Sequence, residues 1–480
     1  MKNIDFNKIK WGPDDSKGDK DLPAYFFEIP EFSGIKDGKY RYVIGRKGTG
    51  KTAVIEKVAS DADADPMSFY SSLSLRDFPL SIIRKLRDKT FKDKSQFVPV
   101  WKFLILIEIC KHIISDEGAE PTDIIDELKD FLVKNFDING FTIVDTLNTL
   151  NENNAKVKVD LKFLGGEAAG ANASTRVSEV HYNSVVSILE KKIRSVKTDS
   201  YYYVLFDELD EGYSARDKNQ RLLLLSLLRA VEDTYLSLDG YGLKVRPLLA
   251  LRSDIFDNLE DNDLNKLDDY IIRLQWTSSD DGPYSLYKLI NKRIQTSFPD
   301  DVVVWGRVVN DNDQALPKAV GSVWKYIVNR TFERPRDLIK FLKLCGQNTA
   351  CGPLLFENVL SAEDSFSRWF YNELRDEIHS HLPVWKECLQ TITKIGRGNI
   401  TKELYEEMLL KDKKINSYLE DSGLVPDDLI ELLFDFSVLG NTDKVNGRWI
   451  FKYKDHDLIW DSEKDLRLHY GFTKKMRIKI

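Results

Sequence analysis

Short hydrophobic runs alternate with longer helix-forming stretches along residues 40–276, and this alternation predicts a parallel β-sheet covered by helices. The run at residues 201–206 is apolar and carries no charge, as is typical of a strand that is buried on both faces. The other expected strands are residues 40–44, 67–71, 244–251 and 271–276. A helix is expected after the last of them, over residues 284–295.

A long segment separates the second expected strand from the third. A plain α/β core needs far fewer residues there, so we expect an insertion over about residues 79–199. Its predicted elements are helices at 80–89, 97–115, 123–135 and 182–196, a strand near 157–161 and a glycine-rich loop at 165–170. The insertion either carries partner specificity or packs beside the core, and the sequence leaves both open.

The chain changes character after residue 352. Helices are predicted at residues 361–381, 384–394, 401–410 and 426–436, followed by β-forming residues at 436–440 and a hairpin signal, Asn446-Gly447, within 445–451. Helices followed by a two-stranded wing predict a winged-helix-like domain. Because residues 426–436 include four acidic side chains, which phosphates repel, we expect this domain to contact protein rather than DNA.

Candidate chemistry lies where the predicted strands end. The first strand leads into Gly45, Arg46, Lys47, Gly48, Thr49, Gly50, Lys51, Thr52 and Ala53, whose Gly-x-x-x-x-Gly-Lys-Thr spacing is typical of a P-loop. The glycines permit a tight turn whose amides point at phosphate oxygens, and the next helix adds its N-terminal dipole. We expect all nine residues to line a nucleotide, with Lys51 on the β- and γ-phosphates and the Thr52 hydroxyl on Mg²⁺.

Two carboxylates follow the uncharged strand, in a Walker B pattern. Asp207 is expected to hold Mg²⁺ through its water shell, and Glu208 to orient and polarise the attacking water. A passive nucleotide binder does not need the second carboxylate, so the pair predicts a hydrolase. The alternative is a solvated acidic loop after a core strand.

An arginine, Arg252, follows the strand at residues 244–251. Polar residues at this end of a strand lie at the carboxyl edge of the sheet, where open α/β folds bind their ligands. Arg252 therefore contacts the γ-phosphate, or it caps the next helix as a surface residue. The sequence favours neither interpretation.

The order of these three strand ends resembles the AAA+ and STAND superfamily of P-loop ATPases, including its origin-recognition-type branch with a C-terminal winged helix. Residues 331–338, Thr-Phe-Glu-Arg-Pro-Arg-Asp-Leu, resemble that superfamily's lid motif. This resemblance implies that Arg336 is a sensor-2 arginine with a catalytic role and that Pro335 lies near the base. The motifs at 45–53, 206–212 and 252–256 together are most similar to a bacterial family of P-loop ATPases, which implies a role in defence against phage.

The expected fold class is therefore α/β, with a P-loop NTPase parallel sheet, a helical insertion, a helical lid and a C-terminal winged-helix-like domain. The expected boundaries are residues 1–280 for the ATPase core, 281–352 for the lid and 353–480 for the last domain with its basic tail. A chain of 480 residues is also too long for one hydrophobic core, which agrees with two or three domains.

Two apparent motifs are rejected. Residues 265–268 fit the Asn-Lys-x-Asp guanine signature, but they follow an acidic helix-like stretch and no Asp-x-x-Gly starts at Asp207, so adenine is the expected base. Cys345 and Cys351 have no second pair or nearby histidine to complete a metal site, and we expect both to be buried thiols.

Composition adds three exclusions. The net charge of −7 makes the whole chain a poor nonspecific binder of nucleic acid. Four cysteines without paired spacing and an N-terminus without an apolar core favour the cytoplasm. The longest apolar run, residues 97–109, is too short to cross a bilayer and includes two charges, so no membrane partner is expected.

Together these features predict an ATP-hydrolysing switch or regulator that uses ATP and Mg²⁺ and self-associates. We expect a protein partner at the insertion or the C-terminal domain, and a neighbouring copy as one source of an arginine finger, with Arg216 and Arg229 as candidates by location. Two alternatives stay open. One is a DNA-associated loader or initiator that grips duplex through the C-terminal domain, and the other is a nucleotide-binding scaffold without turnover.

Overall fold

The chain folds into two compact units. A computed structural model describes residues 4–74, 79–87, 93–136, 142–160, 163, 177–209, 213, 217–259, 261, 264–311, 313–443 and 448–479. One unit, here the sheet unit, comprises Pro30–Arg46 and Lys51–Arg273. The other, here the helical unit, comprises Met1–Ile29, Lys47–Gly50 and Leu274–Ile480. The three-domain boundaries expected from the sequence stay a prediction.

The sheet unit is built on five strands that all pair in parallel. In sheet order they are β2 (Ser68–Ser74), β5 (Tyr201–Asp207), β6 (Lys244–Arg252), β1 (Tyr42–Gly45) and β7 (Ile271–Arg273). The register places Gly45 beside Arg252 and Ser74 beside Asp207. The α/β class and the parallel sheet are therefore confirmed, and the ends of β1, β2, β5 and β6 meet at one edge.

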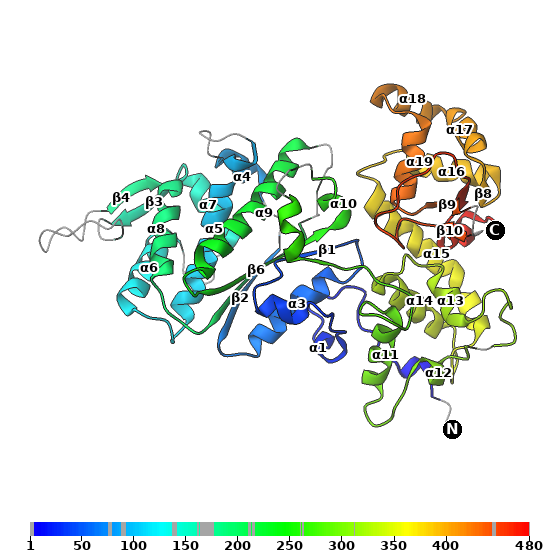
Figure 1. Cartoon of the computed structure of the whole chain (residues 1–480), viewed down its shortest axis with the longest axis horizontal. Coiled ribbons are helices and arrows are strands. Elements are labelled where there is room, and N and C mark those ends of the chain that lie inside the picture. Colours follow the sequence, from blue (N-terminus) through cyan, green and yellow to red (C-terminus); the bar gives the residue numbers. More distant parts are fainter. Residues whose placement is uncertain are drawn as a thin grey trace, which may run out of the picture. The chain divides into compact units, whose positions relative to one another are not determined.

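Helices cover both faces of this sheet (Figure 1). Alternate residues of β5 face opposite ways: the Tyr202 ring stacks near His112 of α5, whereas Tyr203 lies toward the acidic end of α3. The helices of the unit are α2 (Phe32–Lys36), α3 (Lys51–Asp63), α4 (Leu80–Lys85), α5 (Val98–Ser115), α6 (Thr122–Asn135), α7 (Ile143–Glu152), α8 (Tyr182–Arg194), α9 (Lys218–Asp239) and α10 (Ser253–Phe256).

Helix α5 explains the long apolar run of the sequence. It is hydrophobic around its whole circumference and is buried among α6, α8, α9 and the sheet. Its charges are neutralised, because Lys102 pairs with Glu190 at 2.6 Å and Lys111 pairs with Glu108 at 2.7 Å. Across the described residues, no helix is long and apolar enough to span a membrane.

The insertion contains most of the expected elements. Helices α4, α5, α6 and α8 match the predicted helices, with α4 shorter among the described residues, and β3 (Lys156–Asp160) pairs antiparallel with β4 (Val177–His181). Helix α7 was not predicted, although Thr142 and Asp145 form a capping box at its start. The expected glycine-rich loop at 165–170 lies outside the described residues.

The helical unit begins with short elements and continues into a run of helices. Its bounds are α1 (Leu22–Tyr25), α11 (Leu286–Ser297), α12 (Trp305–Val308), α13 (Val323–Val328), α14 (Pro335–Gln347), α15 (Phe356–Ile378), α16 (Trp385–Ile395), α17 (Lys402–Leu410), α18 (Lys413–Ser422), α19 (Pro426–Asp435) and α20 (Thr473–Met476). Helices α14 and α15 pack along each other, with Phe341 stacked on Phe366 at 4.2 Å between ring centroids.

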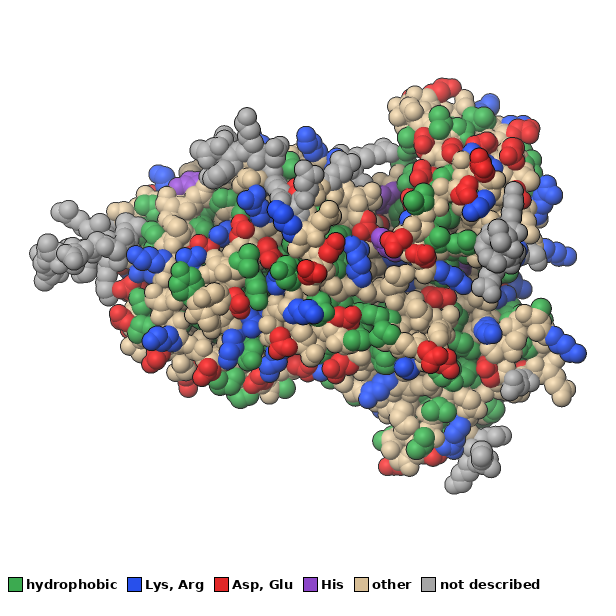
Figure 2. Space-filling view, in the orientation of Figure 1, with side chains coloured by type: hydrophobic (Ala, Val, Ile, Leu, Met, Phe, Trp, Pro, Cys, Tyr) green, Lys and Arg blue, Asp and Glu red, His purple; other side chains and the backbone are tan. Residues whose placement is uncertain are grey.

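The C-terminal part combines helices α16–α19 with a four-stranded antiparallel sheet in the order β10 (Arg448–Ile450), β9 (Leu439–Asp443), β11 (Leu466–Leu468), β8 (Asn399–Ile400). The β9–β10 pairing agrees with the hairpin signal, whose Asn446-Gly447 turn lies outside the described residues. Helix α18 was not predicted. Acidic side chains are visible over the α16–α19 part of the face drawn in Figure 2.

Two local expectations are corrected and a third agrees with the structure. Cys351 is exposed, because it lies in the loop between α14 and α15, whereas Cys345 is buried as expected. Strand β7 ends at Arg273, and Trp276 beyond it donates its indole N–H to the Thr49 carbonyl at 2.8 Å. Residues 265–268 lie in a 3₁₀ helix, Leu264–Tyr270, and not at a strand tip, which agrees with rejecting the guanine signature.

Candidate functional site

The loop between β1 and α3 has the backbone of a phosphate-binding turn. Strand β1 ends at Gly45 and α3 begins at Lys51. Gly48 and Gly50 have φ values of 82° and 99°, a region that side-chain-bearing residues rarely adopt. The sequence-predicted glycines are therefore required by backbone conformation at these two positions.

The loop lysine folds back over the loop. The Lys51 ammonium donates to the Gly45 carbonyl at 3.0 Å and to the Arg46 carbonyl at 3.1 Å. Lys51 is the first residue of α3, where the helix dipole also favours negative charge. A cation held here is placed to bind a phosphate group.

Thr52 and Asp207 meet directly, although the chain brings them from α3 and from the end of β5. The Thr52 hydroxyl donates a hydrogen bond to the Asp207 carboxylate, and Lys51 lies near the same carboxylate. Burial raises the pKa of Asp207, against the opposing effect of these neighbours and of the Glu208 amide.

A hydroxyl and a carboxylate side by side are hard oxygen donors, which fits Mg²⁺. Across the described residues, no group of three or more His, Cys, Asp or Glu forms a metal site. Mg²⁺ at nucleotide sites does not need such a cluster, because substrate phosphates and water supply most of its ligands. Thr52 and Asp207 are thus the residues that would hold it.

Glu208 adopts an uncommon backbone conformation with φ of 58°. Such a conformation in a non-glycine residue costs of order 1 kcal/mol and is frequent at functional sites. Its amide donates to Asp207 Oδ1 at 2.8 Å, and its carboxylate accepts a hydrogen bond from the Ser74 hydroxyl. Ser74 was missed by sequence reasoning, because only the register of β2 beside β5 brings it to Asp207 and Glu208.

Arg252 ends β6 beside Gly45, and its guanidinium is paired within its own segment. Its Nε donates to Asp254 Oδ1 at 2.9 Å and its Nη2 to Asp254 Oδ2 at 2.6 Å. The side chain makes no cap to the following helix α10. The contact between Arg252 and a γ-phosphate stays a prediction.

Within the helical unit, the P-loop tip lies against the start of α14. The Arg336 amide donates to the Gly48 carbonyl at 3.2 Å, and a Cβ on Gly48 would lie 3.1 Å from Arg336 Cβ. Lys47 and Arg336 both form ion pairs with Glu373 of α15. The sequence resemblance implies that Arg336 lies near the nucleotide, and that role stays a prediction.

The remaining candidates are placed but not tested. Pro335 is buried at the first position of α14, Thr49 is buried in the loop, and Ala53 lies in the first turn of α3. Arg229, on α9, is about half exposed and lies 3.8 Å from Asp233. Arg216 lies outside the described residues.

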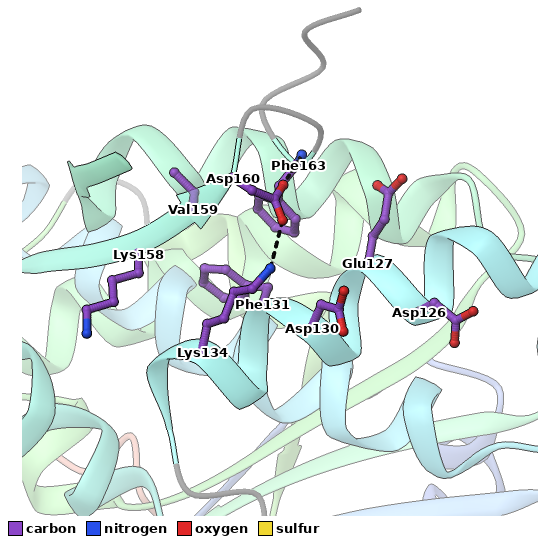
Figure 3. Close-up of a pocket in the computed structure, with 9 residues that line it drawn as sticks. All are labelled: Asp126, Glu127, Asp130, Phe131, Lys134, Lys158, Val159, Asp160 and Phe163. Carbon is purple, nitrogen blue, oxygen red and sulfur yellow. Dashed lines mark hydrogen bonds and ion pairs between the residues drawn. The ribbon is translucent and has the colours of Figure 1, made fainter. Parts of the chain in front are cut away.

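A separate cavity of about 70 Å³ lies in the insertion between α6 and β3 (Figure 3). The rings of Phe131 and Phe163 stack at 4.8 Å between centroids, and Lys134 pairs with Asp160 at 2.8 Å across its mouth. It contains no residue of the P-loop or the strand ends.

Part of the helical unit matches a known domain family. Residues 284–375 match the family described as the FunZ-associated C-terminal helical domain, a match that covers α11–α14 and most of α15. No curated protein matches the chain. Among solved structures, the chain is similar to the crystal structure of Cdc6p from Pyrobaculum aerophilum at 11% identity, over 96% of this chain and 98% of that chain, with a TM-score of 0.29. The proposals below do not depend on that last likeness.

Proposed function

We propose that this chain hydrolyses ATP at the P-loop and that the change of nucleotide state changes its conformation. The observation that carries the proposal is the hydrogen bond from the Thr52 hydroxyl to the Asp207 carboxylate. It joins the end of the P-loop to the end of β5, and it assembles the oxygen donors that Mg²⁺ prefers beside a lysine suited to phosphate.

In this proposal each residue has a separate task. Lys51 binds the β- and γ-phosphates, and Glu208, oriented by Ser74, polarises the attacking water and accepts its proton. Mg²⁺, when bound, neutralises phosphate charge. Arg252 and Arg336 reach the γ-phosphate as charge develops there. The nucleotide we propose is ATP, because the Asn-Lys-x-Asp sequence at residues 265–268 lies in a 3₁₀ helix and not at a strand tip.

The deciding experiment measures nucleotide binding and phosphate release in parallel. Lys51→Ala should abolish binding of Mg·ATP, whereas Glu208→Gln should bind it and lose turnover by about 10²–10⁴-fold. Glu117→Gln, an exposed glutamate outside the site, serves as the matched control. Normal turnover in the Glu208→Gln protein would refute the hydrolytic role.

For the partner, we propose protein rather than DNA at the C-terminal domain. Burial raises the pKa of Glu431 on α19, and the carboxylates of Asp435, Asp427 and Asp428 raise it further. A helix face that concentrates carboxylates repels phosphates. A gel shift with duplex DNA that disappears when residues beyond Gly440 are removed would instead support the loader alternative.

The cellular role we propose follows the family resemblance: a self-associating switch in defence against phage. Arg229 supplies the finger from a neighbouring copy, a role that its exposed position supports. The mass of the protein in solution should increase with Mg·ATP, and plaque formation should fall in cells with wild-type protein but not with Lys51→Ala. Equal plaque counts for both would contradict the defence role.

A further inference from the structure

A carboxylate of α15 lies between two cations at the P-loop tip. Glu373 Oε2 is 3.4 Å from Lys47 Nζ and 3.6 Å from Arg336 Nη1. This oxygen is buried and accepts no hydrogen bond from any described residue. Buried polar atoms normally have a hydrogen-bond partner, so this oxygen is held by its two long ion pairs, in a geometry that another anion can replace.

Arg334, close to Arg336 in the chain, forms firmly held ion pairs and serves as a comparison. Arg334, two residues before Arg336, is bound by Asp337 at 2.9 Å and by Glu377, which is one turn after Glu373 on α15. These three side chains are at most 3% exposed, and their hydrogen bonds are complete and charge-assisted. The Arg336 side chain, in contrast, is 26% exposed, and its ion pair with Glu373 is long, at 3.6 Å. At the start of α14, Arg334 is thus held firmly by its carboxylates, whereas Arg336 can exchange Glu373 for another anion.

Lys47, like Arg336, forms only long ion pairs among the described residues and can exchange them for another anion. Besides Glu373 it faces Asp376 Oδ2 at 3.5 Å, again beyond ordinary hydrogen-bond length. A phosphate carries more charge than a carboxylate and binds lysine and arginine well. A phosphate at the P-loop tip therefore competes with Glu373 for both cations, because two anions close together repel each other.

We propose that Glu373 is a positioning residue that competes with the nucleotide's phosphate for Lys47 and Arg336, so that ATP binding releases the C-terminal turns of α15. The inference rests on the proposed function. It identifies a path from the nucleotide to the C-terminal domain, since α15 also donates from Ser367 Oγ to the Gly471 carbonyl at 2.6 Å and packs Phe370 against Phe472.

The test uses full-length Glu373→Gln, which keeps the shape of the side chain and removes its charge. Titration calorimetry with Mg·ATPγS should show about two- to fivefold tighter binding than wild type, the range expected for removing one partly exposed competing charge. Binding of ADP, which lacks the phosphate that Arg336 reaches, should change less. Asp376→Asn is the matched control, because Asp376 faces Lys47 but is not paired with Arg336. Glu373→Asp should restore an affinity close to wild type.

A second readout does not depend on turnover. Backbone hydrogen exchange over residues 368–378 should rise when Mg·ATPγS is added to the wild-type protein, and it should already be high in Glu373→Gln without nucleotide. The inference is overturned if a folded Glu373→Gln protein binds ATPγS no more tightly than wild type does. It is also overturned if the affinities for ATPγS and ADP rise equally. In either case, ATP turnover by the wild-type protein would leave the proposed function standing. If the wild-type protein binds neither nucleotide, the proposed function fails and the inference fails with it.

Discussion

Asp207→Asn should stabilise the protein in the absence of nucleotide and abolish its response to Mg·ATP. Burial raises the pKa of Asp207 above its ordinary value of 3.8. A raised carboxyl pKa means that the folded chain binds the proton more tightly than the unfolded chain does. The side chain therefore favours folding at low pH, and this contribution is lost as the pH rises through the folded-state pKa. At neutral pH the ionised carboxylate is a net cost.

The size of the effect follows from what the substitution keeps. Asn retains an oxygen that can accept from the Glu208 amide, which is 2.8 Å from Oδ1 in the wild type. It loses the charge, and with it the attraction to Lys51 and the charged hydrogen bond from the Thr52 hydroxyl. Because burial is the largest of the effects on the Asp207 pKa, the removal of the desolvated charge is expected to outweigh these losses. Removal of a buried charge at a functional site typically raises the free energy of unfolding by about 1 kcal/mol. For a unit of this size, that corresponds to a rise of about 2–4 °C in the melting temperature. In wild type, a ligand at a hundred times its Kd adds about 2.7 kcal/mol, and the variant should gain none of it.

Scanning calorimetry at pH 7.5 and pH 5, with and without Mg·ATP, measures both effects. The melting temperature of Asp207→Asn should exceed that of wild type by more at pH 7.5 than at pH 5. Asp116→Asn is a control of opposite sign: burial alone would raise the pKa of Asp116, but hydrogen bonds from Thr198 and Tyr202, each 2.7 Å, lower it, so this substitution should destabilise. The reasoning is refuted if Asp207→Asn is folded yet less stable than wild type at pH 7.5, or if Mg·ATP stabilises both equally.

Three further predictions concern single positions. Ser74→Ala should lower kcat about tenfold at unchanged KM in a phosphate-release assay, because a hydrogen bond to a charged group contributes about 1.5–3 kcal/mol, whereas Ser74→Thr keeps the hydroxyl and most of the rate. Gly48→Ala should weaken Mg·ATP binding about tenfold by calorimetry, since φ is 82° and the new methyl group meets Arg336 Cβ; unchanged affinity would show that the loop relaxes freely. Under native conditions Cys351 alone of the four thiols should react fast with a thiol reagent, because burial raises the pKa of Cys345, Cys110 and Cys388.

The sequence predicts best where a local pattern and a buried strand coincide. The uncharged run before Asp207 is β5, and the glycine spacing after β1 is a loop with two positive φ angles. Both patterns are short-range, so they do not depend on how distant segments meet. The same is true of α5, whose apolar circumference has no explanation other than burial.

Features that depend on distant pairing were missed. Ser74 has no motif around it, and only the parallel register with β5 gives it a role. Helix α7 is amphipathic with a capping box, but it follows residues for which no strand or helix was expected. Cys351 was expected to be a buried thiol once a metal site had been rejected, yet the break between α14 and α15 places it at the surface.

Arg252 and Arg336, the two candidates for the γ-phosphate, also show that a partner distant in the chain is hard to predict from the sequence. Each is paired with a carboxylate, but the partner of Arg252 is two residues away in sequence, whereas the partner of Arg336 is on the next helix. Arg-Ser-Asp at 252–254 was visible in the chain, while Glu373 looked like one more polar position on an amphipathic helix. We propose that both pairs compete with phosphate, so that the affinity for ATP depends on acids outside the P-loop and the Walker B pair. Substitution of these acids should therefore separate ATP from ADP binding more clearly than substitution of the P-loop, which binds both.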